Sequence, residues 1–389
     1  MFYDARVPGF ANNRQSQSTP FSLAVTLTSP RGPFSNPYLG VSNPFPAPLP
    51  PPKDTPFPPP VLVYSWSPND RLSPVVYNAN LAIEHQLAPN WLARIAYVGS
   101  HSSHLNVNEQ LNPAVYTPGS TLAADARRNY KGFSGILLAS SAGNSLYNSM
   151  QATLQKRLSR GFTVLANYTW SKALDNVPIG TEYVTPTVGA VYVMPPSMEG
   201  FKGLDIGRSD FDRHHVVSIS YVWHLAGLAR SNPLLRGVAG GWQVNGIVLA
   251  QSGPQLTVSA GSDRSQTAIN RDRGVLVSDD TYRSGACANV SPCLNFLNTA
   301  AFALPATGTF GNIGKGLLQS PGFFNWDMAM SKNFPVREGV SVRLRAEFFN
   351  LLNHENPNAP TSNVSGAGFG TIRGGRDPRI GQIALKITF

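Results

Sequence analysis

Near the end of the chain, large apolar side chains occupy every second position. In residues 380–389, Ile383, Leu385, Ile387 and Phe389 recur at every second position. Because successive side chains point to opposite faces of a β-strand, this segment predicts a strand with one apolar and one polar face. Such a strand suits the wall of a membrane β-barrel, and it also suits a half-buried strand of a soluble sheet. The rest of the chain has to decide between them.

Composition favours a membrane β-barrel over a soluble sheet. Charged residues make up 13% of the 389 residues, about half the usual share of a soluble domain. The sequence contains no run of eighteen apolar residues, so no transmembrane helix is predicted. The 35 Gly and 33 Pro disfavour a helical fold. The net charge of +10 is spread without a block of Lys and Arg, so we expect no nucleic-acid partner.

Alternating segments recur in pairs from residue 75 onward. Short turns join three pairs, which are Val75–Leu87 with Trp91–Gly99, Ser145–Leu158 with Gly161–Ser171, and Phe323–Phe334 with Val340–Leu352. A fourth pair, His214–Leu225 and Gly241–Gly253, has a longer connection. Two alternating segments joined by a tight turn form an antiparallel hairpin.

The connections between these hairpins are long. They are Ser100–Asn144, Lys172–Arg213, residues 254–322 and Asn353–Arg379. Strict alternation of short and long connections places every long loop at one end of the sheet, as in bacterial outer-membrane barrels. The sequence therefore predicts an all-β, antiparallel transmembrane β-barrel, present in part as nine or ten strands. We assign it to residues 75–389, after an irregular, Pro-rich region at 1–74 that holds at most one strand, Phe21–Leu27.

The cost of burying charge predicts which face meets lipid. In Val340–Leu352 the even positions from 340 to 348 are apolar, and the odd positions include Arg343, Arg345 and Glu347. An Arg on the lipid face at the bilayer midplane costs about 2–4 kcal/mol, and two would rival a typical domain stability of about 5–15 kcal/mol. We therefore predict that these three residues and Lys386 face the lumen, with Glu347 paired to Arg345 or to a charge on a neighbouring strand.

Aromatic residues gather near the ends of the predicted strands. Amphipathic rings favour the depth of the membrane interface, so this distribution predicts an aromatic girdle. The alternative is packing at the rim of a sandwich core. The girdle residues are Trp91, Trp170, Trp223, Trp242, Trp326 and the terminal Phe389.

Cys287 and Cys293 are the only cysteines. Their close spacing predicts a disulfide that clips a loop in an oxidising compartment. A metal site would need more ligands than this pair provides.

Several stretches resemble one family in order and spacing. They are AYVGSHSSHL (96–105), LANYTWSKALD (165–175), SDFDRHHVVSISYVW (209–223), GGWQVNGIVLAQSGPQLTV (240–258), FGNIGKGLLQSPGFFNWDMAMSKNFPV (310–336), VRLRAEFFNLLNHENP (342–357) and RDPRIGQIALKITF (376–389). With these stretches the chain resembles the C-terminal β-barrel part of a TonB-dependent outer-membrane receptor of the Oar-like type. The resemblance implies a 22-stranded barrel with a plug, in the outer membrane of a Gram-negative bacterium. It also implies uptake driven by the TonB–ExbB–ExbD complex.

The chain departs from that family in its N-terminal part. It shows no plug, TonB box or signal peptide, and Met1 begins a stretch like mid-barrel sequence. We therefore expect a fragment whose natural N-terminus is missing and which does not transport by itself. The expected partners are outer-membrane lipid, an unidentified ligand and, through the C-terminal strand, the barrel-assembly machinery.

Motifs for catalysis are missing from the sequence. It contains no Gly-x-Ser-x-Gly, P-loop or His-Glu-x-x-His, so we predict no catalytic residue and no cofactor. GAGFGTIRGG (366–375) is interpreted as a flexible loop. His214 and His215 beside Asp210 and Asp212 could ligate a metal, but we favour a loop cap at the outer mouth of a strand and predict no metal site.

The predicted function is the barrel wall of an energised outer-membrane receptor for an unidentified ligand. The alternative is a non-energised structural or adhesive outer-membrane barrel that uses the same surface loops. A third possibility, an outer-membrane hydrolase, lacks a Ser/His/carboxylate constellation.

Overall fold

The computed structural model describes residues 32–43, 54, 61–66, 72–177, 203–225, 240–287 and 293–389. Helical structure in these residues is limited to three short 3₁₀ turns, η1 (Ala124–Arg127), η2 (Gly203–Asp205) and η3 (Thr299–Ala301). None of the described helices is long and apolar enough to cross a membrane. The predicted strand at Phe21–Leu27 and most of the Pro-rich stretch lie outside the described residues.

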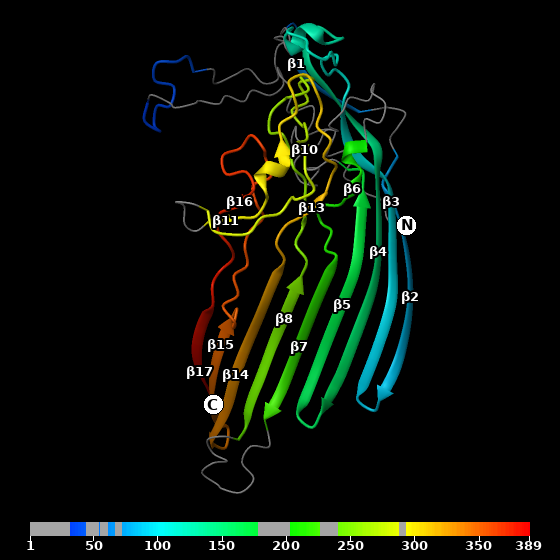
Figure 1. Cartoon of the computed structure of the whole chain (residues 1–389). Helices are drawn as coiled ribbons and strands as arrows, with labels where there is room; N and C mark the ends of the chain where they lie inside the picture. Colours follow the sequence, from blue (N-terminus) through cyan, green and yellow to red (C-terminus); the bar gives the residue numbers. More distant parts are fainter. Residues whose placement is uncertain are drawn as a thin grey trace.

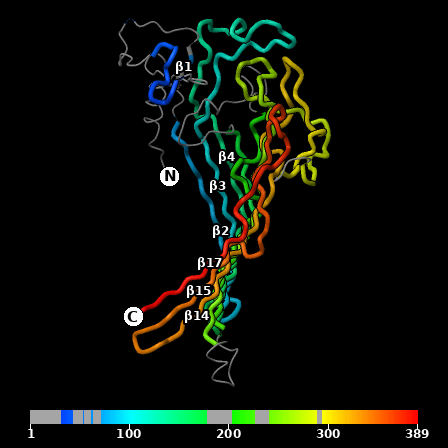
Figure 2. Tube along the Cα trace, turned by 90° about the vertical axis from the view of Figure 1, so that its left-hand side faces the viewer, coloured from blue at the N-terminus to red at the C-terminus, as the bar shows by residue number. Residues whose placement is uncertain are grey.

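In the part of the chain that the structure describes, nine long strands form one antiparallel meander in which neighbours in sequence are neighbours in the sheet (Figure 1). The strands are β2 (Val75–Ala88), β3 (Trp91–Gln110), β4 (Phe133–Ser159), β5 (Phe162–Asp175), β7 (His215–Leu225), β8 (Trp242–Gln251), β14 (Phe323–Arg337), β15 (Val340–Phe349) and β17 (Ile380–Thr388). The predicted all-β, antiparallel fold is confirmed. The described strands form a curved wall with β2 and β17 at its edges. Figure 2, turned by 90°, shows the lower ends of β14, β15 and β17 bending away from the rest of the wall.

Short turns lie at the lower end of the wall and long connections at the upper end, as Figure 1 shows. In the turn between β4 and β5, Arg160 and Gly161 have φ of 51° and 77°. Positive φ at both central residues is the geometry of a type I′ turn, whose twist matches that of the flanking strands. The connection between β7 and β8, residues 226–239, lies outside the described part of the chain.

Strands β3 and β4 are longer than the sequence predicted. The predicted segments stopped at Gly99 and resumed at Ser145, whereas pairing continues to Gln110 and begins again at Phe133. The polar stretch 100–144 is therefore partly a hairpin and not only a loop. A barrel strand needs about 9–11 residues to cross a membrane, so the extra length reaches beyond the apolar part of the wall, where alternation no longer marks a strand.

A further strand lies in the region expected to be irregular. β1 (Val61–Trp66) pairs in parallel with Phe133–Ala139 of β4. The sequence analysis missed it because no alternating pattern marks a short strand beside so many prolines. The two-residue strand β6 (Gly207–Arg208) similarly pairs with the end of β5.

The strand register brings the apolar side chains of neighbouring strands opposite one another, so that they form one surface. Leu385 lies opposite Leu344, which lies opposite Lys332, and Val217, Ala250 and Phe324 form another row across β7, β8 and β14. Following the pairing from β17 to β2 keeps the apolar positions on the same side throughout. We call this side the apolar face and the opposite side the polar face. Large side chains on the apolar face are exposed in the isolated chain, for example Ile383 at 79% and Leu81 at 69%.

Candidate functional site

The long connections fold together at the upper end of the wall. We call their described residues, 111–132, 203–214, 252–287, 293–322 and 350–379, the loop assembly. Its hydrophobic core contains Leu256, Val258, Leu297, Ala301, Phe302, Ile313, Leu318 and Phe369. Seven of these residues come from the connection between β8 and β14, and Phe369 comes from the connection between β15 and β17. The loops therefore have a packed interior of their own.

Short strands join distant parts of the loop assembly. β9 (Gln255–Leu256) pairs with β13 (Leu318–Gln319), β10 (Val275–Leu276) pairs with β12 (Phe302–Ala303), and β11 (Leu294–Asn295) pairs with β16 (Thr371–Ile372). The β11–β16 pair connects two different long connections. These ladders satisfy backbone groups that a buried loop would otherwise leave unpaired.

The glycine-rich stretch GAGFGTIRGG belongs to this core. Phe369 is 9% exposed and Ile372 is 2% exposed, and the Phe369 ring meets the Phe302 ring edge to face at a centroid distance of 5.5 Å. Gly370 has a φ of 76°, and any other residue at this position would place its Cβ 3.0 Å from the carbonyl oxygen of Leu297. The interpretation as a flexible loop was wrong, because the glycines allow close packing around two apolar side chains.

Two buried ion pairs hold the loop assembly in place, and one of them connects it to the wall. Lys315 is paired with Asp175 at the end of β5, and its ammonium also donates to the Val177 carbonyl oxygen at 2.6 Å. A second pair, Arg273 with Asp205, joins two connections within the loop assembly. The side chains of both pairs are at most 10% exposed. Buried charges are tolerated only when they are paired in this way, so these contacts fix how the loops sit on the strands.

Burial alters the titration of two further carboxyl groups in the loop assembly. The pKa of Asp210 is raised above its ordinary value mainly by desolvation; Lys315 opposes this rise and Asp175 reinforces it. The pKa of Asp272 is raised, again chiefly by desolvation. Its Oδ2 accepts a hydrogen bond from the Ser265 backbone N–H at 2.6 Å.

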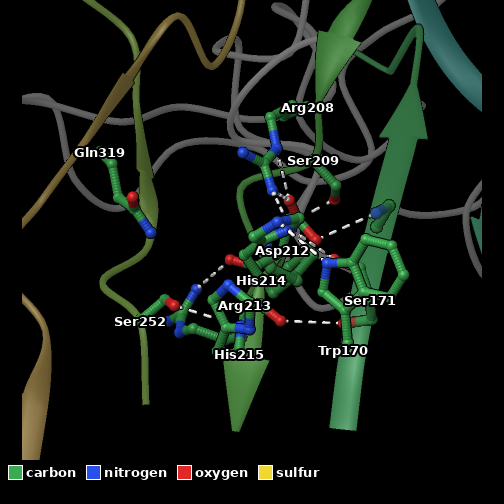
Figure 3. A network of polar contacts seen from close by, with 12 residues as sticks. Trp170, Ser171, Arg208, Ser209, Asp212, Arg213, His214, His215, Ser252 and Gln319 are labelled. Carbon is green, nitrogen blue, oxygen red and sulfur yellow. Dashed lines mark hydrogen bonds and ion pairs between the residues drawn. The ribbon is translucent and has the colours of Figure 1, made fainter. Parts of the chain in front are cut away.

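A polar network lies where β5 and β7 meet the loops (Figure 3). The indole N–H of Trp170 donates to Nε2 of His214 at 3.1 Å, and Nδ1 of His214 lies 2.9 Å from the Ser171 carbonyl oxygen. Because an indole can only donate, Nε2 of His214 must accept, so Nδ1 carries the proton and donates to Ser171. Both nitrogens of His214 are therefore occupied.

The acidic member of this network is also occupied. Asp212 Oδ1 accepts the Ala173 backbone N–H at 3.0 Å, and Oδ2 accepts from Nε of Arg208 at 2.6 Å. These contacts agree with a cap at the mouth of β7 and leave neither His214 nor Asp212 available to a metal. Among the described residues, no group of three or more His, Cys, Asp or Glu side chains is arranged to hold a metal ion.

Cys287 and Cys293 are joined by a disulfide in the structure, with a Cα–Cα distance of 5.4 Å. The bridge lies in the loop assembly beside β11. The backbone N–H of Cys287 also donates to the Cys293 carbonyl oxygen at 3.1 Å.

The four charged residues predicted to face the lumen lie on the polar face. Arg343 lies opposite Lys386, and Arg345 pairs with Glu347 at 2.5 Å. Gln382 on β17 also donates to the Glu347 carboxylate. Glu347 thus pairs with Arg345, one of the two partners that the sequence analysis considered.

The aromatic residues of the predicted girdle all lie on the apolar face. Register places Trp91, Trp223, Trp242 and Phe389 near the short turns, and Trp170 near the loop assembly. Trp326 lies one apolar row inside the loop end, where its indole N–H donates to the Tyr221 hydroxyl at 3.1 Å.

Taken as a site, the loop assembly can present a preorganised surface at one end of a wall but shows no constellation for bond-breaking chemistry. The sequence analysis located its loops but missed its core and its ion pairs. A usable signal was the apolar content of NFLNTAAFAL (295–304), which lies inside a connection that was interpreted as an insert.

A meander whose strands share one continuous apolar face, with the described long connections at one end, defines a β-barrel wall of an outer membrane. The family model for the outer membrane beta barrel domain matches residues 1–382, and the chain belongs to this family. The predicted resemblance and the outer-membrane location are confirmed at this level. No curated protein matches the chain.

Solved structures with a similar course are outer-membrane transporters and receptors. The outer membrane transporter YddB from Escherichia coli shares 10% identity at a TM-score of 0.43, over 82% of this chain and 33% of that one. The ferric enterobactin receptor PfeA from Pseudomonas aeruginosa shares 12% identity at a TM-score of 0.41, over 81% and 31%. The pyoverdine receptor FpvA from Pseudomonas aeruginosa PAO1 shares 10% at a TM-score of 0.39, over 82% and 30%. The chain spans about a third of the length of these proteins.

Proposed function

We propose that the chain is the wall and external loops of an energised, TonB-dependent outer-membrane receptor, which binds its ligand at the loop assembly and in the lumen. The loop assembly carries this proposal. Two connections that are far apart in sequence share one core, one buried ion pair joins connections within the loop assembly, and another ties it to β5. Loops that are ordered before binding lose less conformational entropy when a ligand arrives, which favours recognition.

The height of the apolar face supports its contact with hydrocarbon. Along β14, the apolar side chains from Phe324 to Phe334 cover about 34 Å at ~3.4 Å per residue. At a strand tilt of ~45° this projects to about 24 Å, close to the apolar band of outer-membrane barrels, about 25 Å tall. The polar face would then line the lumen, with Arg343, Arg345, Glu347 and Lys386 among its residues.

The aromatic residues fit the two edges of this band. Near the short turns, Lys332 lies on the apolar face with its ammonium 5.5 Å from the Trp242 ring and 5.0 Å from the Phe334 ring. Lys156 repeats the arrangement over Phe162 at 5.3 Å. A long cationic side chain beside aromatic rings is typical of an interface, where the stem stays in the apolar layer and the charge leaves it. We infer that these rings form the girdle near the short turns and that Trp170 belongs to the girdle near the loop assembly.

Two partners belong to the same proposal. The TonB–ExbB–ExbD complex would supply energy to the whole receptor, and the barrel-assembly machinery would insert the wall through β17. We propose no enzymatic role, because the described polar clusters serve as caps and as ion pairs within the loop assembly and between it and β5.

Two measurements test the proposal. Outer-membrane fractionation with heat-modifiable gel migration tests the barrel; recovery as a soluble monomer contradicts it. Depletion of solutes from spent medium is then compared between cells with and without the receptor, in the presence and absence of TonB. Receptor-dependent depletion that disappears without TonB supports energised uptake. Surface attachment or depletion that does not depend on TonB supports the structural or adhesive alternative instead.

A further inference from the structure

Arg376 stands on the polar face, at the loop end of β14. Its guanidinium lies 4.8 Å from the centre of the Phe323 ring. The register places Phe323 opposite Gln251 and on the same side of β14 as Asn325 and Asp327, which is the polar face. On the proposed orientation, this position is the external mouth of the lumen.

Two elements hold this cation in place. Asn356 is 4% exposed, and its side-chain amide clamps the backbone of Phe324, accepting from the N–H and donating to the carbonyl oxygen at 2.8 Å each. The backbone N–H of Arg376 donates to the Asn356 carbonyl oxygen at 2.9 Å. The connection that carries the cation is therefore fastened to the strand that carries the ring beneath it, so the cation is ordered before any ligand arrives.

The hydrogen-bonding edge of this guanidinium is available. Stacking on a ring uses the flat face of a guanidinium and leaves its N–H donors pointing outward in the plane. In the part of the chain that the structure describes, Arg376 takes part in no ion pair, and the residue is exposed. An ordered fork of donors suits a carboxylate, which it can bind with two parallel hydrogen bonds.

Apolar side chains interrupt the polar face just below this cation. Leu249 lies opposite Asn325, and Ile247 lies opposite Asp327. They therefore lie two and four residues below Phe323 in the register, or about 7 and 14 Å at ~3.4 Å per residue. Ile247 is 55% exposed, although its face of the wall is otherwise mostly polar.

Leu165 extends this apolar surface to β5. It lies opposite Ser220 of β7, which in turn lies opposite Ile247 of β8. The Leu165 side chain is 38% exposed. Exposed apolar side chains that gather on a polar surface mark a binding site. We give the name lumen-mouth site to Arg376, Phe323, Leu249, Ile247 and Leu165.

We propose that the lumen-mouth site binds an amphipathic anion, a carboxylate on an apolar body. The carboxylate accepts from the Arg376 guanidinium, and the body passes over Phe323 to cover Leu249 and Ile247, which removes apolar surface from water. The net charge of +10 favours the approach of an anion. The inference rests on the proposed function, because it needs a polar face that lines a lumen open to the loop side.

The test uses the full chain extracted from outer membranes in mild detergent and measures binding of 2-naphthoate by equilibrium dialysis, corrected for uptake by detergent alone. Arg376→Gln removes the cation, and the matched control Arg373→Gln makes the same charge change in the same connection. Leu249→Asn makes the apolar surface polar, and Leu92→Asn does so near the short turns of the same face. We expect Arg376→Gln to weaken binding about tenfold, Leu249→Asn to weaken it less, and both controls to bind normally. Heat-modifiable migration checks that each variant is folded.

Two related compounds test the assigned chemistry. The amide 2-naphthamide has the same apolar body without the charge, and acetate has the charge without the body. We expect neither compound to displace 2-naphthoate at a concentration at which more 2-naphthoate does. Displacement by either one overturns the assignment of an amphipathic anion.

Other outcomes separate the site from the orientation of the wall. Normal binding by Arg376→Gln, or equal losses in Arg376→Gln and Arg373→Gln, overturns the site. The orientation is measured by labelling Ser220→Cys on the polar face and Ile219→Cys on the apolar face with a water-soluble maleimide, since both natural cysteines are held in the disulfide. If Ser220→Cys reacts faster while the site variants bind normally, the site is wrong and the proposed function stands. If Ile219→Cys reacts faster, both fail.

Discussion

Lys315 in the loop assembly forms a buried ion pair with Asp175 at the upper end of β5. Removing one partner of such a pair leaves an uncompensated buried charge, which costs about 3–5 kcal/mol. We therefore expect Lys315→Met to loosen the attachment of residues 311–319 to the wall. Faster hydrogen exchange of the amides in this segment, with exchange in β4 unchanged, is the expected readout.

Two controls sharpen this prediction. Replacing both partners, Lys315→Met with Asp175→Leu, restores most of the protection if the loss comes from the stranded carboxylate. Arg94→Met breaks the exposed pair with Glu84, whose side chains are 39% and 56% exposed, and should cost no more than about 1 kcal/mol. If Lys315→Met behaves like Arg94→Met, the pair does not attach the loops.

The two faces of β17 are expected to differ in their tolerance of charge. Ile383 lies on the apolar face near the middle of the band, opposite Ala346, whereas Gln382 lies on the polar face opposite Glu347. Ile383→Arg should destabilise the inserted wall by about 2–4 kcal/mol. Gln382→Arg gains a carboxylate partner and should be tolerated. Urea unfolding in lipid vesicles compares the two, and equal effects would contradict the assignment of faces.

Phe369 is expected to anchor the glycine-rich stretch to the loop core. Phe369→Ala removes a ring that is 9% exposed and packs on Phe302, and a buried Phe→Ala change typically costs about 3–5 kcal/mol. The expected result is proteolytic cleavage within 360–375 while the barrel keeps its heat-modifiable migration. Phe211→Ala, at a ring that is 80% exposed, is the control. Unchanged resistance in Phe369→Ala would show that the core does not depend on this ring.

Asp210 should make the loop assembly less stable as pH rises. Burial raises the pKa of its carboxyl, so the folded state holds the proton more tightly than the unfolded state does. The corresponding stabilisation is complete below the ordinary value of 3.8 and is lost as pH rises through the raised pKa. Asp210→Asn should therefore increase hydrogen-exchange protection near residues 205–213 at pH 7 but not at pH 3.5, after correction for intrinsic rates. Equal gains at both pH values would point to a cause other than ionisation.

The alternation of apolar and polar residues predicted most of the wall strands from the sequence. The segments at 162–171, 215–225 and 380–389 were predicted within a few residues, because contact with an apolar medium on one side leaves a period of two in the sequence. The choice of face for Arg343 and Arg345 followed from the same pattern, and the structure places both on the polar face. Where the period disappears, as in the upper parts of β3 and β4, the prediction stopped too early.

What the sequence determined by itself is therefore the strand pattern, the order of short and long connections, and the outer-membrane family. Only the tertiary structure decided that the long connections share a core, that Phe369 and Ile372 belong to it, and that Lys315 reaches Asp175. The reason is physical: a strand in a wall reflects its environment locally, residue by residue, whereas loop packing depends on contacts between segments that are distant in the sequence. Phe369 packs on Phe302, and Lys315 reaches Asp175, which is 140 residues away. No local period reveals such contacts.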